Sequence, residues 1–513
     1  MCKKKTSVLL CILLLIVLIL AFALRWALAN YGHVSMDEIV FHLNMPLEGA
    51  DANLLTDYLR TSLLPAILIW LACLALMTFP RSRHFALSFY GRKTDRNKPL
   101  FSIQLLPLHL PAWLFAFGLF CALLSVYLRA DMLFSFTDYM KNQFTRSSFI
   151  EQEYVFPEDV EITFPQAKRN LINIYIESGE TSSADHASGG LMNTNYTPEL
   201  TQIAKENISF SQSELIEGAA AAPGCGWTIA GLVAQTSGLP LKLPNHYNNV
   251  MSKYETFLPG AVSLGEILEK EGYHNYFMCG SDFSFGGRLK YFSAHGNYEI
   301  FDYNWAKAYH KIPEDYHVFW GFEDARLFTF AKEKLTEIAA KDEPFNFSLL
   351  TVDTHIPEGY VCDLCPHKYT SQYADVWACA SAQISDFVSW LQEQPFYENT
   401  MVVITGDHLS MNSHFYGANT DDDYLGQAKR KVYNAFLNTA AEPVKETNRL
   451  FTTMDIFPTV LGGLGARIEG ERLGLGTNLF SEEETLSEKY GFPKLFAELQ
   501  KKSTFYNEVL LFP

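Results

Sequence analysis

The sequence predicts an α/β domain with a mostly parallel central sheet, preceded by a helical membrane module. From about residue 165 onward, short apolar runs bounded by turn residues alternate with longer helical patterns, as in α/β sandwiches. The first 130 residues instead carry long apolar stretches that suit membrane-spanning helices. We expect four parts, at residues 1–130 (transmembrane module), 131–165 (amphipathic connector), 166–480 (large α/β domain) and 481–513 (C-terminal extension).

Composition limits the classes of protein that this chain can represent. The 513 residues carry a formal net charge of −17, which excludes a general electrostatic nucleic-acid binder, so we expect no nucleic acid as partner. Hydrophobic residues make up 48% of the chain, which is too many for a disordered protein. A chain of this length and composition can bury a sizeable core.

Three apolar stretches without charges are long enough to cross a hydrocarbon core of about 30 Å. They run over Ser7–Leu24, Thr61–Phe79 and Leu106–Leu128. The first stretch could alternatively be a cleaved signal peptide, because Ala27-Leu28-Ala29 is similar to a cleavage site. Either alternative leaves the large domain on the same side of the membrane.

Basic residues predict the orientation of the module. Lysines precede the first span, and the segment between the second and third spans is basic, whereas the segment between the first and second is mostly acidic. The basic residues are Lys3, Lys4, Lys5, Arg81, Arg83, Arg92, Lys93, Arg96 and Lys98. The positive-inside rule places these segments in the cytoplasm, so everything after the third span is expected outside.

The connector at 131–165 has aromatic residues interleaved with polar ones, such as Phe136, Tyr139 and Phe144. Such a segment either lies on the membrane surface or forms a plain linker helix. The extension at 481–513 mixes charged and aromatic residues, and the sequence assigns it no role.

The large domain contains four apolar runs typical of buried parallel strands and four helical patterns between them. The expected strands are Asn170–Ile176, His274–Met278, Phe345–Thr351 and Met401–Ile404. The expected helices are Thr228–Gln235, Ser263–Lys270, Asp324–Ala340 and Tyr373–Gln394.

Polar residues follow three of these strands, at the sheet edge where ligands bind in open α/β folds. Glu177 follows the first strand, Asp353 and His355 follow the third, and Asp407-His408 follows the fourth. Carboxylates and an imidazole from separate strand ends form a set suited to Zn²⁺ or Mn²⁺. Each residue taken alone could instead be structural, because an Asp after a strand often caps the next helix.

The candidate nucleophile lies in the run from Gly224 to Gly231, GCGWTIAG. Thr228 is expected near a helix N-terminus, where backbone amides favour a phosphate. A threonine hydroxyl needs activation, which coordination to a divalent cation supplies. Alternatively, Thr228 caps its helix. Cys225 is a rival nucleophile, but no adjacent feature lowers the pKa of its thiol.

Five cysteines lie in the part of the chain expected outside: Cys225, Cys279, Cys362, Cys365 and Cys379. The pair Cys362 and Cys365 has the spacing of half a zinc knuckle, but no second pair of that spacing follows. A disulfide-stapled loop involving Cys379 is the simpler interpretation in an oxidising compartment.

The strand end at Glu177, the GCGWTIAG run and the Gly406-Asp407-His408 triplet together resemble the alkaline phosphatase/sulfatase superfamily. More narrowly, the chain is similar to bacterial phosphoglycerol transferases, the group of lipoteichoic acid synthases and of the enzyme that modifies periplasmic glucans. The segments Phe285–Arg288 (FGGR) and Asp353–Gly359 (DTHIPEG) favour the glucan-modifying branch. Gly286 stands where lipoteichoic acid synthases have a Trp, which leaves the acceptor open.

This resemblance implies a role for each matched residue. The implied metal ligands are Glu177, Asp407 and His408, with Thr228 as fourth group and nucleophile. His355 and Arg288 would hold the substrate, and His355 could also protonate the leaving group. A surface salt bridge is the structural alternative for Arg288. Asp282 and His414 are further substrate-binding candidates that could simply hydrogen-bond a loop.

The resemblance also implies an activity. The protein would transfer a glycerophosphoryl group from phosphatidylglycerol to a periplasmic glycan, through a metal-bound glycerophosphoryl-threonine intermediate, and release diacylglycerol. The metal would be Mn²⁺ or Zn²⁺, with Mg²⁺ possible, and the catalytic domain would face the periplasm from the bacterial inner membrane. The alternatives are a phosphoethanolamine transferase acting on lipid A or another envelope glycan, and a non-catalytic membrane sensor or scaffold.

Overall fold

The computed structural model describes residues 2–31, 34–45, 52–78, 85–89, 101–105, 112–243, 257–412, 414–417 and 429–513. The chain divides into two compact units. The first comprises Met1–Asn30 and Asp51–Met132, and the second comprises Tyr31–Ala50 and Leu133–Pro513. The segment between the first two apolar helices therefore belongs to the unit that contains the α/β domain.

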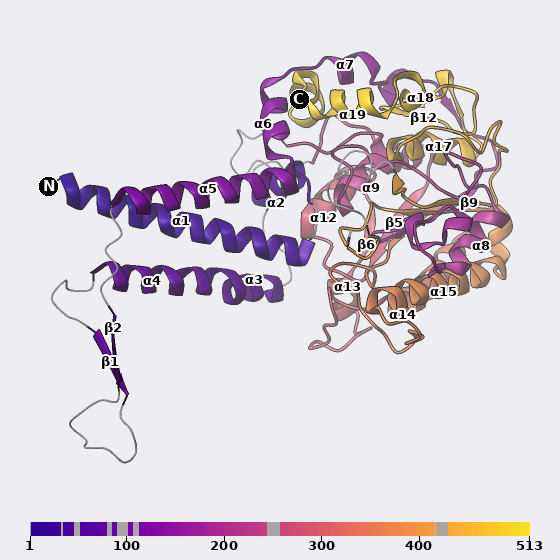
Figure 1. The fold of residues 1–513 in the computed structure, drawn as a ribbon. Coiled ribbons are helices and arrows are strands. Elements are labelled where there is room, and N and C mark those ends of the chain that lie inside the picture. The colour runs from indigo at the N-terminus through magenta and orange to yellow at the C-terminus, as the bar shows by residue number, and fades with distance from the viewer. Residues whose placement is uncertain are drawn as a thin grey trace. The chain divides into compact units, whose positions relative to one another are not determined.

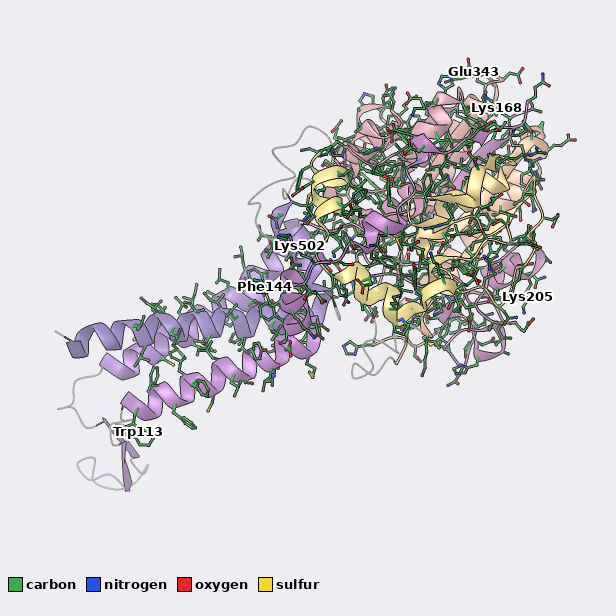
Figure 2. All side chains as sticks on the ribbon, turned by 90° about the horizontal axis from the view of Figure 1, so that it is seen from above. Trp113, Phe144, Lys168, Lys205, Glu343 and Lys502 are labelled. Atoms are coloured by element: carbon green, nitrogen blue, oxygen red, sulfur yellow. The ribbon has the colours of Figure 1, made fainter. Side chains whose placement is uncertain are left out.

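The first unit is built from apolar helices and one β-hairpin. Its elements are α1 (Cys2–Tyr31), α3 (Ala52–Tyr58), the π-helical turn η1 (Leu59–Leu63), α4 (Leu64–Thr78), α5 (Ala112–Phe134) and the antiparallel strands β1 (Phe85–Phe89) and β2 (Phe101–Leu105). The side chain of Trp70 donates a hydrogen bond of 2.9 Å to the carbonyl of Cys11, which joins α4 to α1. Apolar side chains, Trp113 among them, project outward from these helices (Figure 2).

Three stretches in this part of the chain are helical, apolar and long enough to cross a membrane, and each overlaps one of the predicted spans. They are Leu9–Asn30, Leu55–Ala75 and Phe115–Phe134. The predicted ends Phe79 and Leu106 lie outside the described residues, as do Arg81, Arg83, Arg92, Lys93, Arg96 and Lys98.

The second unit is organised around a six-stranded sheet in the order β6-β5-β7-β4-β8-β9. The strands are β4 (Asn170–Ile176), β5 (His274–Cys279), β6 (Glu299–Phe301), β7 (Phe345–Leu350), β8 (Thr400–Gly406) and β9 (Asn434–Leu437). All neighbouring pairs are parallel except β8 and β9. The predicted mostly parallel α/β fold is confirmed.

Helices cover both faces of this sheet (Figure 1). Ile172, Ile174 and Ile176 of β4 share a core with α8 (Pro198–Glu206), α14 (Asp324–Ala339) and α15 (Gln372–Gln392). Leu171 and Tyr175 face the other layer, which contains α9 (Thr228–Ser237), α11 (Leu264–Lys270) and α17 (Ile456–Gly463). The apolar run of β4 is continuous because both of its faces are buried.

The four predicted helices correspond to α9, α11, α14 and α15, each within two residues at either end. Ser263 is the N-cap of α11 rather than its first residue, because its side chain and that of Glu266 form a capping box. The short strands β6 and β9 have no counterpart among the predicted elements.

Smaller elements complete the second unit. The helices are α2 (Met36–Asn44), α6 (Phe136–Phe144), α7 (Phe149–Glu153), α12 (Arg288–Ala294), α13 (Tyr303–Ala308), α18 (Leu486–Tyr490), α19 (Phe492–Gln500) and the π-helix η9 (Tyr506–Leu511). The strands are β3 (Ile162–Thr163), β10 (Arg467–Ile468), β11 (Arg472–Leu473) and β12 (Gly476–Thr477). The short helical turns are η2 (Pro157–Asp159), η3 (Thr181–Ser183), η4 (His186–Ser188), η5 (Phe285–Gly287), η6 (Pro395–Asn399), η7 (Thr453–Asp455) and η8 (Glu469–Glu471).

Both ends of the second unit pack into its core. Phe149 and Ile150 of α7, Leu499 of α19 and Tyr506 of η9 share one hydrophobic cluster with Trp227, next to the candidate nucleophile. Charged side chains such as Lys168, Lys205 and Glu343 lie at the surface of this unit (Figure 2). The C-terminal residues therefore contribute to the core that supports α9.

Candidate active site

The carboxyl ends of β4 and β8 lie side by side and bring three candidate ligands together. Glu177 follows β4, and Asp407 and His408 follow β8. One ligand atom from each of these buried side chains lies within 4.8 Å of the others. The Nε2 atom of His408 is 3.6 Å from Oε1 of Glu177 and 3.5 Å from Oδ2 of Asp407.

Hydrogen bonds orient each of these groups. Oδ1 of Asp407 accepts from the backbone amides of Ser178 (2.8 Å) and His408 (2.7 Å). The hydroxyl of Ser178 donates to Glu177 Oε1 at 2.8 Å. Nδ1 of His408 lies 2.8 Å from the carbonyl of Leu409, which can only accept, so Nδ1 carries a proton and Nε2 is the nitrogen that can bind a metal.

The two carboxylates influence each other's ionisation. Burial opposes ionisation of Glu177, but His355 and His408, together with the hydrogen bond from Ser178 and the charge of Arg288, outweigh burial and lower its pKa. For Asp407, burial and the neighbouring Glu177 raise the pKa. Oδ2 of Asp407 is buried and accepts no hydrogen bond from the described residues. Two close carboxylates with an unused oxygen and a free imidazole nitrogen fit a divalent cation, which would remove the repulsion between them.

Thr228 is the first residue of α9, and its hydroxyl points at this group. Oγ1 lies 3.4 Å from Glu177 Oε2 and 3.5 Å from His408 Nε2. The N-cap position belongs to Trp227, so Thr228 does not cap its helix. The side chain is only partly buried, and the first amides of α9 lie beside it, where they favour an incoming phosphate.

Close backbone packing makes this approach possible. A Cβ at Gly231 would lie 1.9 Å from the carbonyl oxygen of Asp407, and one at Gly406 would lie 1.7 Å from that of Gly179. Glycine is therefore required where α9 meets the end of β8 and where the ends of β4 and β8 meet. The rival nucleophile Cys225 is fully buried, and burial raises the pKa of its thiol to about 12.

His355 approaches from the loop after β7. Its Nδ1 lies 3.0 Å from the carbonyl of Ile356, which leaves Nε2 free for a substrate by the argument used for His408. The ring packs against Trp320 with a centroid separation of 4.7 Å. His355 is partly exposed, so a substrate can reach it.

The other predicted substrate-binding residues are placed differently. Arg288 is buried and donates to the carbonyls of Phe285 (3.1 Å) and Asp282 (2.7 Å), so it organises its own loop and forms no surface ion pair among the described residues. The carboxylate of Asp282 accepts from the amide and hydroxyl of Ser284, and these bonds outweigh burial and lower its pKa. His414 is exposed in a turn at 414–417, between stretches outside the described residues.

Helix α2 supplies residues that the motifs did not indicate. Phe41 is buried against Trp227, with ring centroids 5.4 Å apart, and the ring of His42 stacks near Phe285 at 6.1 Å. Burial and repulsion from His355 lower the pKa of His42 to about 4, so His42 is neutral at neutral pH. Burial also raises the pKa of Glu38 to about 8, against the attraction of His408.

The sequence indicates where helix α2 begins, but not what the helix packs against. The side chain of Ser35 accepts from the amide of Glu38, which is the N-cap pattern that starts α2. Nothing in the spacing of these residues indicates that a segment before the second apolar stretch meets residues more than 180 positions later.

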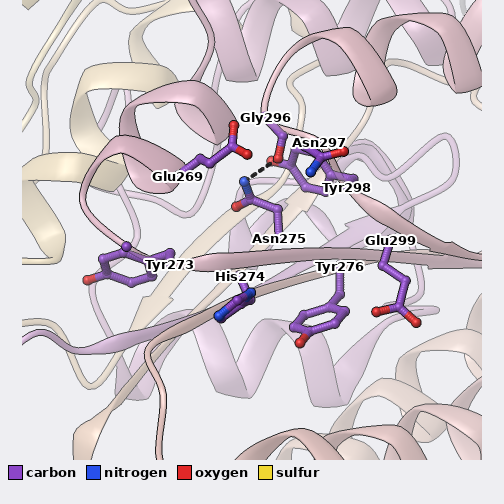
Figure 3. Close-up of a pocket in the computed structure, with 10 residues that line it drawn as sticks. Glu269, Tyr273, His274, Asn275, Tyr276, Gly296, Asn297, Tyr298 and Glu299 are labelled. Atoms are coloured by element: carbon purple, nitrogen blue, oxygen red, sulfur yellow. Dashed lines mark hydrogen bonds between the residues drawn. The ribbon is translucent and has the colours of Figure 1, made fainter.

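A separate hollow lies at the end of the sheet where the parallel strands begin, away from the carboxyl ends that carry the candidate active site (Figure 3). Its volume is about 520 Å³, and it is lined by residues at the amino ends of β5 and β6, including His274 and Glu299. Asn275 donates 2.6 Å to the carbonyl of Gly296 in its wall. Because Glu177 and Asp407 lie at carboxyl ends, this hollow is not part of the candidate active site.

The alkaline phosphatase superfamily, which the sequence motifs resemble, includes the sulfatase family. The sulfatase family matches residues 169–466 of this chain. The chain therefore belongs to the sulfatase family of this superfamily.

Curated relatives carry a more specific name. Phosphoglycerol transferase I of Escherichia coli is 32% identical over 326 residues, covering 62% of this chain and 40% of that protein. Phosphoglycerol transferase I of Salmonella choleraesuis is 31% identical over 335 residues, covering 64% and 41%. The match thus spans less than half the length of these relatives.

Solved structures with a similar fold include the lipoteichoic acid synthase LtaP from Listeria monocytogenes, at 18% identity and a TM-score of 0.48, covering 65% of this chain and 81% of that chain. The C-terminal periplasmic domain of EptC from Escherichia coli, solved with Zn, is 13% identical with a TM-score of 0.41, covering 62% and 88%.

Proposed function

We propose that this protein transfers a glycerophosphoryl group from phosphatidylglycerol to a hydroxyl of a periplasmic glycan. The other product is diacylglycerol. The observation that carries the proposal is the position of the Thr228 hydroxyl, 3.4 Å from Glu177 and 3.5 Å from His408 at the start of a helix. The names of the curated relatives support the choice of group. The apolar helices support a lipid donor, because they would hold the domain near it.

Glu177, Asp407 and His408 would hold a divalent ion, with Thr228 as the fourth group. Zn²⁺ and Mn²⁺ suit this set of one imidazole and two carboxylates. When bound, the ion supplies the positive charge that keeps the Thr228 oxygen ionised near neutral pH and stabilises charge on the phosphoryl oxygens.

In the first step, the Thr228 oxygen forms a bond to phosphorus while the bond from phosphorus to the diacylglycerol oxygen breaks. His355 gives a proton to that oxygen, and the Thr228 proton passes to solvent. In the second step, an acceptor hydroxyl loses its proton to His355 and bonds to phosphorus, and the bond to the Thr228 oxygen breaks. The amides at the start of α9 bind the phosphoryl oxygens in both steps.

The replacement Thr228→Ala should abolish transfer without changing the fold, because it removes only the attacking oxygen. The assay uses the full-length protein in vesicles containing head-group-labelled phosphatidylglycerol, and it measures diacylglycerol release and label on Thr228. Thr228→Ser is the matched control, since it keeps a hydroxyl and should retain measurable transfer. Wild-type rates in the alanine variant would remove Thr228 from the mechanism.

The donor is tested in the same vesicles with labelled phosphatidylethanolamine. Transfer from phosphatidylethanolamine alone would contradict the phosphoglycerol proposal and favour the phosphoethanolamine transferase. Failure to bind any divalent ion, together with no transfer from either lipid, would favour the non-catalytic alternative.

A further inference from the structure

Three cysteines outside the candidate active site converge in the interior of the second unit. Cys362 and Cys365 lie in the loop that follows β7 and His355, and Cys379 lies on α15. The Cys362 sulfur is 3.8 Å from that of Cys365 and 3.6 Å from that of Cys379. All three sulfurs lie within 4.8 Å of one another, and all three residues are buried.

These separations are those of sulfurs that share a metal ion. A disulfide holds its sulfurs about 2.05 Å apart and joins only two of them. Tetrahedral Zn²⁺ with Zn–S bonds of about 2.3 Å places its sulfur ligands about 3.8 Å apart. The eight cysteines whose side chains are described, from Cys11 to Cys379, are all free. The sequence predicted a loop closed by a disulfide, whereas the structure has three free cysteines side by side.

A hydrogen-bond donor lies beside two of the sulfurs, as in thiolate sites. The Nε2 atom of Gln383, one turn after Cys379 on α15, lies 3.3 Å from the Cys379 sulfur and 3.9 Å from the Cys362 sulfur. The backbone amide of Cys365 donates 3.1 Å to the carbonyl of Cys362, which closes the turn that brings their sulfurs together. A side-chain donor such as Gln383 orients ligating side chains and stabilises negative charge on sulfur.

We propose that Cys362, Cys365 and Cys379 bind one zinc ion, separate from the ion expected at Glu177, Asp407 and His408. Soft thiolate ligands select Zn²⁺ over the hard cations that carboxylates bind. The ion would fasten the loop after β7 to α15, and this loop carries His355. This role of the ion, which fastens the loop, does not depend on the reaction proposed above.

The first test uses wild-type full-length protein in detergent, isolated without added reductant and with free thiols trapped by iodoacetamide. Elemental analysis should find zinc bound, and mass spectrometry should find the three cysteines reduced. A disulfide between any two of them in the freshly isolated protein would overturn the proposal. This measurement needs no variant, so it holds even if the variants fold poorly.

The second test replaces the metal by Co²⁺ and records the thiolate-to-cobalt charge-transfer band, which the thiol-free site at Glu177 cannot produce. Cys362→Ser and Cys379→Ser should each lose the band and one equivalent of zinc per chain. Cys279→Ala, which removes another buried thiol of the same unit, should keep both. Glu177→Gln should keep the band while transfer falls. Equal zinc content in the wild type and Cys362→Ser would refute the site.

Discussion

At the residue scale, Gly231 shows how the absence of a side chain allows close packing at the candidate active site. Its backbone packs so closely on the end of β8 that a Cβ would lie 1.9 Å from the Asp407 carbonyl oxygen. Thr228, three residues earlier on the same helix, depends on this contact for its distance to Glu177 and His408.

Gly231→Ala should therefore displace α9 from the end of β8 and reduce transfer by at least about tenfold, since each 1.4 kcal/mol lost from the transition state costs a factor of ten. Gly226→Ala is the matched control for folding, because a Cβ at Gly226 meets nothing within 4 Å. Thermal unfolding and transfer rates are measured for both variants. A Gly231→Ala protein with wild-type transfer would show that the close contact is not needed.

The residues of the candidate active site could be predicted from the sequence only where a recognisable pattern surrounds them. Glu177 and Asp407 each follow an apolar run whose strand assignment was clear, and strand ends on a parallel sheet meet at one edge. Arg288 was harder to interpret, because the sequence cannot show that its guanidinium turns back to the carbonyls of its own loop. Glu38 and His42 carried no signal, since their contacts exist only after folding.

At the scale of the element, helix α2 is short, but one of its faces packs into a hydrophobic cluster of the second unit. Phe41 is 1% exposed and lies in the same hydrophobic cluster as Trp227, whereas Leu43 on the same helix is 80% exposed. Met45 follows the helix and approaches Gly287, where a Cβ would lie 2.8 Å from its terminal methyl. The helix thus packs against both the GCGWTIAG run and the FGGR turn.

Phe41→Ala should destabilise the second unit by about 3–5 kcal/mol, the usual cost of emptying a buried phenylalanine site. Transfer should also fall, because Trp227 loses a ring contact next to Thr228. Leu43→Ala is the matched control and should change neither quantity appreciably. Denaturant unfolding in detergent measures the stability, and an equal effect of both substitutions would refute the packing argument.

Strand length decided which elements could be predicted. The strands β4, β5, β7 and β8 have six or seven residues each, enough for an apolar run to be recognised. The strand β6 has three residues and the antiparallel edge strand β9 has four, and neither is long enough to establish a period. The sheet order likewise depends on long-range pairing, which no local pattern records.

At the scale of the whole molecule, the connector and the C-terminal extension close the second unit together. Glu153 of α7 is buried and accepts from the Lys489 ammonium at 3.1 Å, and it also pairs with Arg472 at 3.4 Å and with the hydroxyl of Tyr490. Burial alone would raise the pKa of Glu153, but the bonds from Tyr490 and Lys489 outweigh burial and lower it.

This shift sets a pH dependence. A carboxyl whose pKa is lower in the folded state adds stability above its unfolded pKa, near 4.5, and loses that contribution as the pH falls through the folded value. Glu153→Gln should therefore cost about 2 kcal/mol at pH 7, the usual range for hydrogen bonds to a charged group, and clearly less below pH 4. Glu151→Gln, at an exposed position of the same helix, is the control. A cost that does not change between the two pH values would contradict this assignment.

The assignment of Tyr31–Ala50 to the second unit bears on how this protein is prepared for experiments. A soluble fragment that starts after the third apolar helix would lack Phe41 and His42, so it would expose the Trp227 ring beside the candidate nucleophile. Rate constants and inhibitor affinities from such a truncation would describe a site that lacks these contacts. Fusing residues 34–45 to the fragment, or supplying them as a peptide, is the direct way to restore the contact between Phe41 and Trp227.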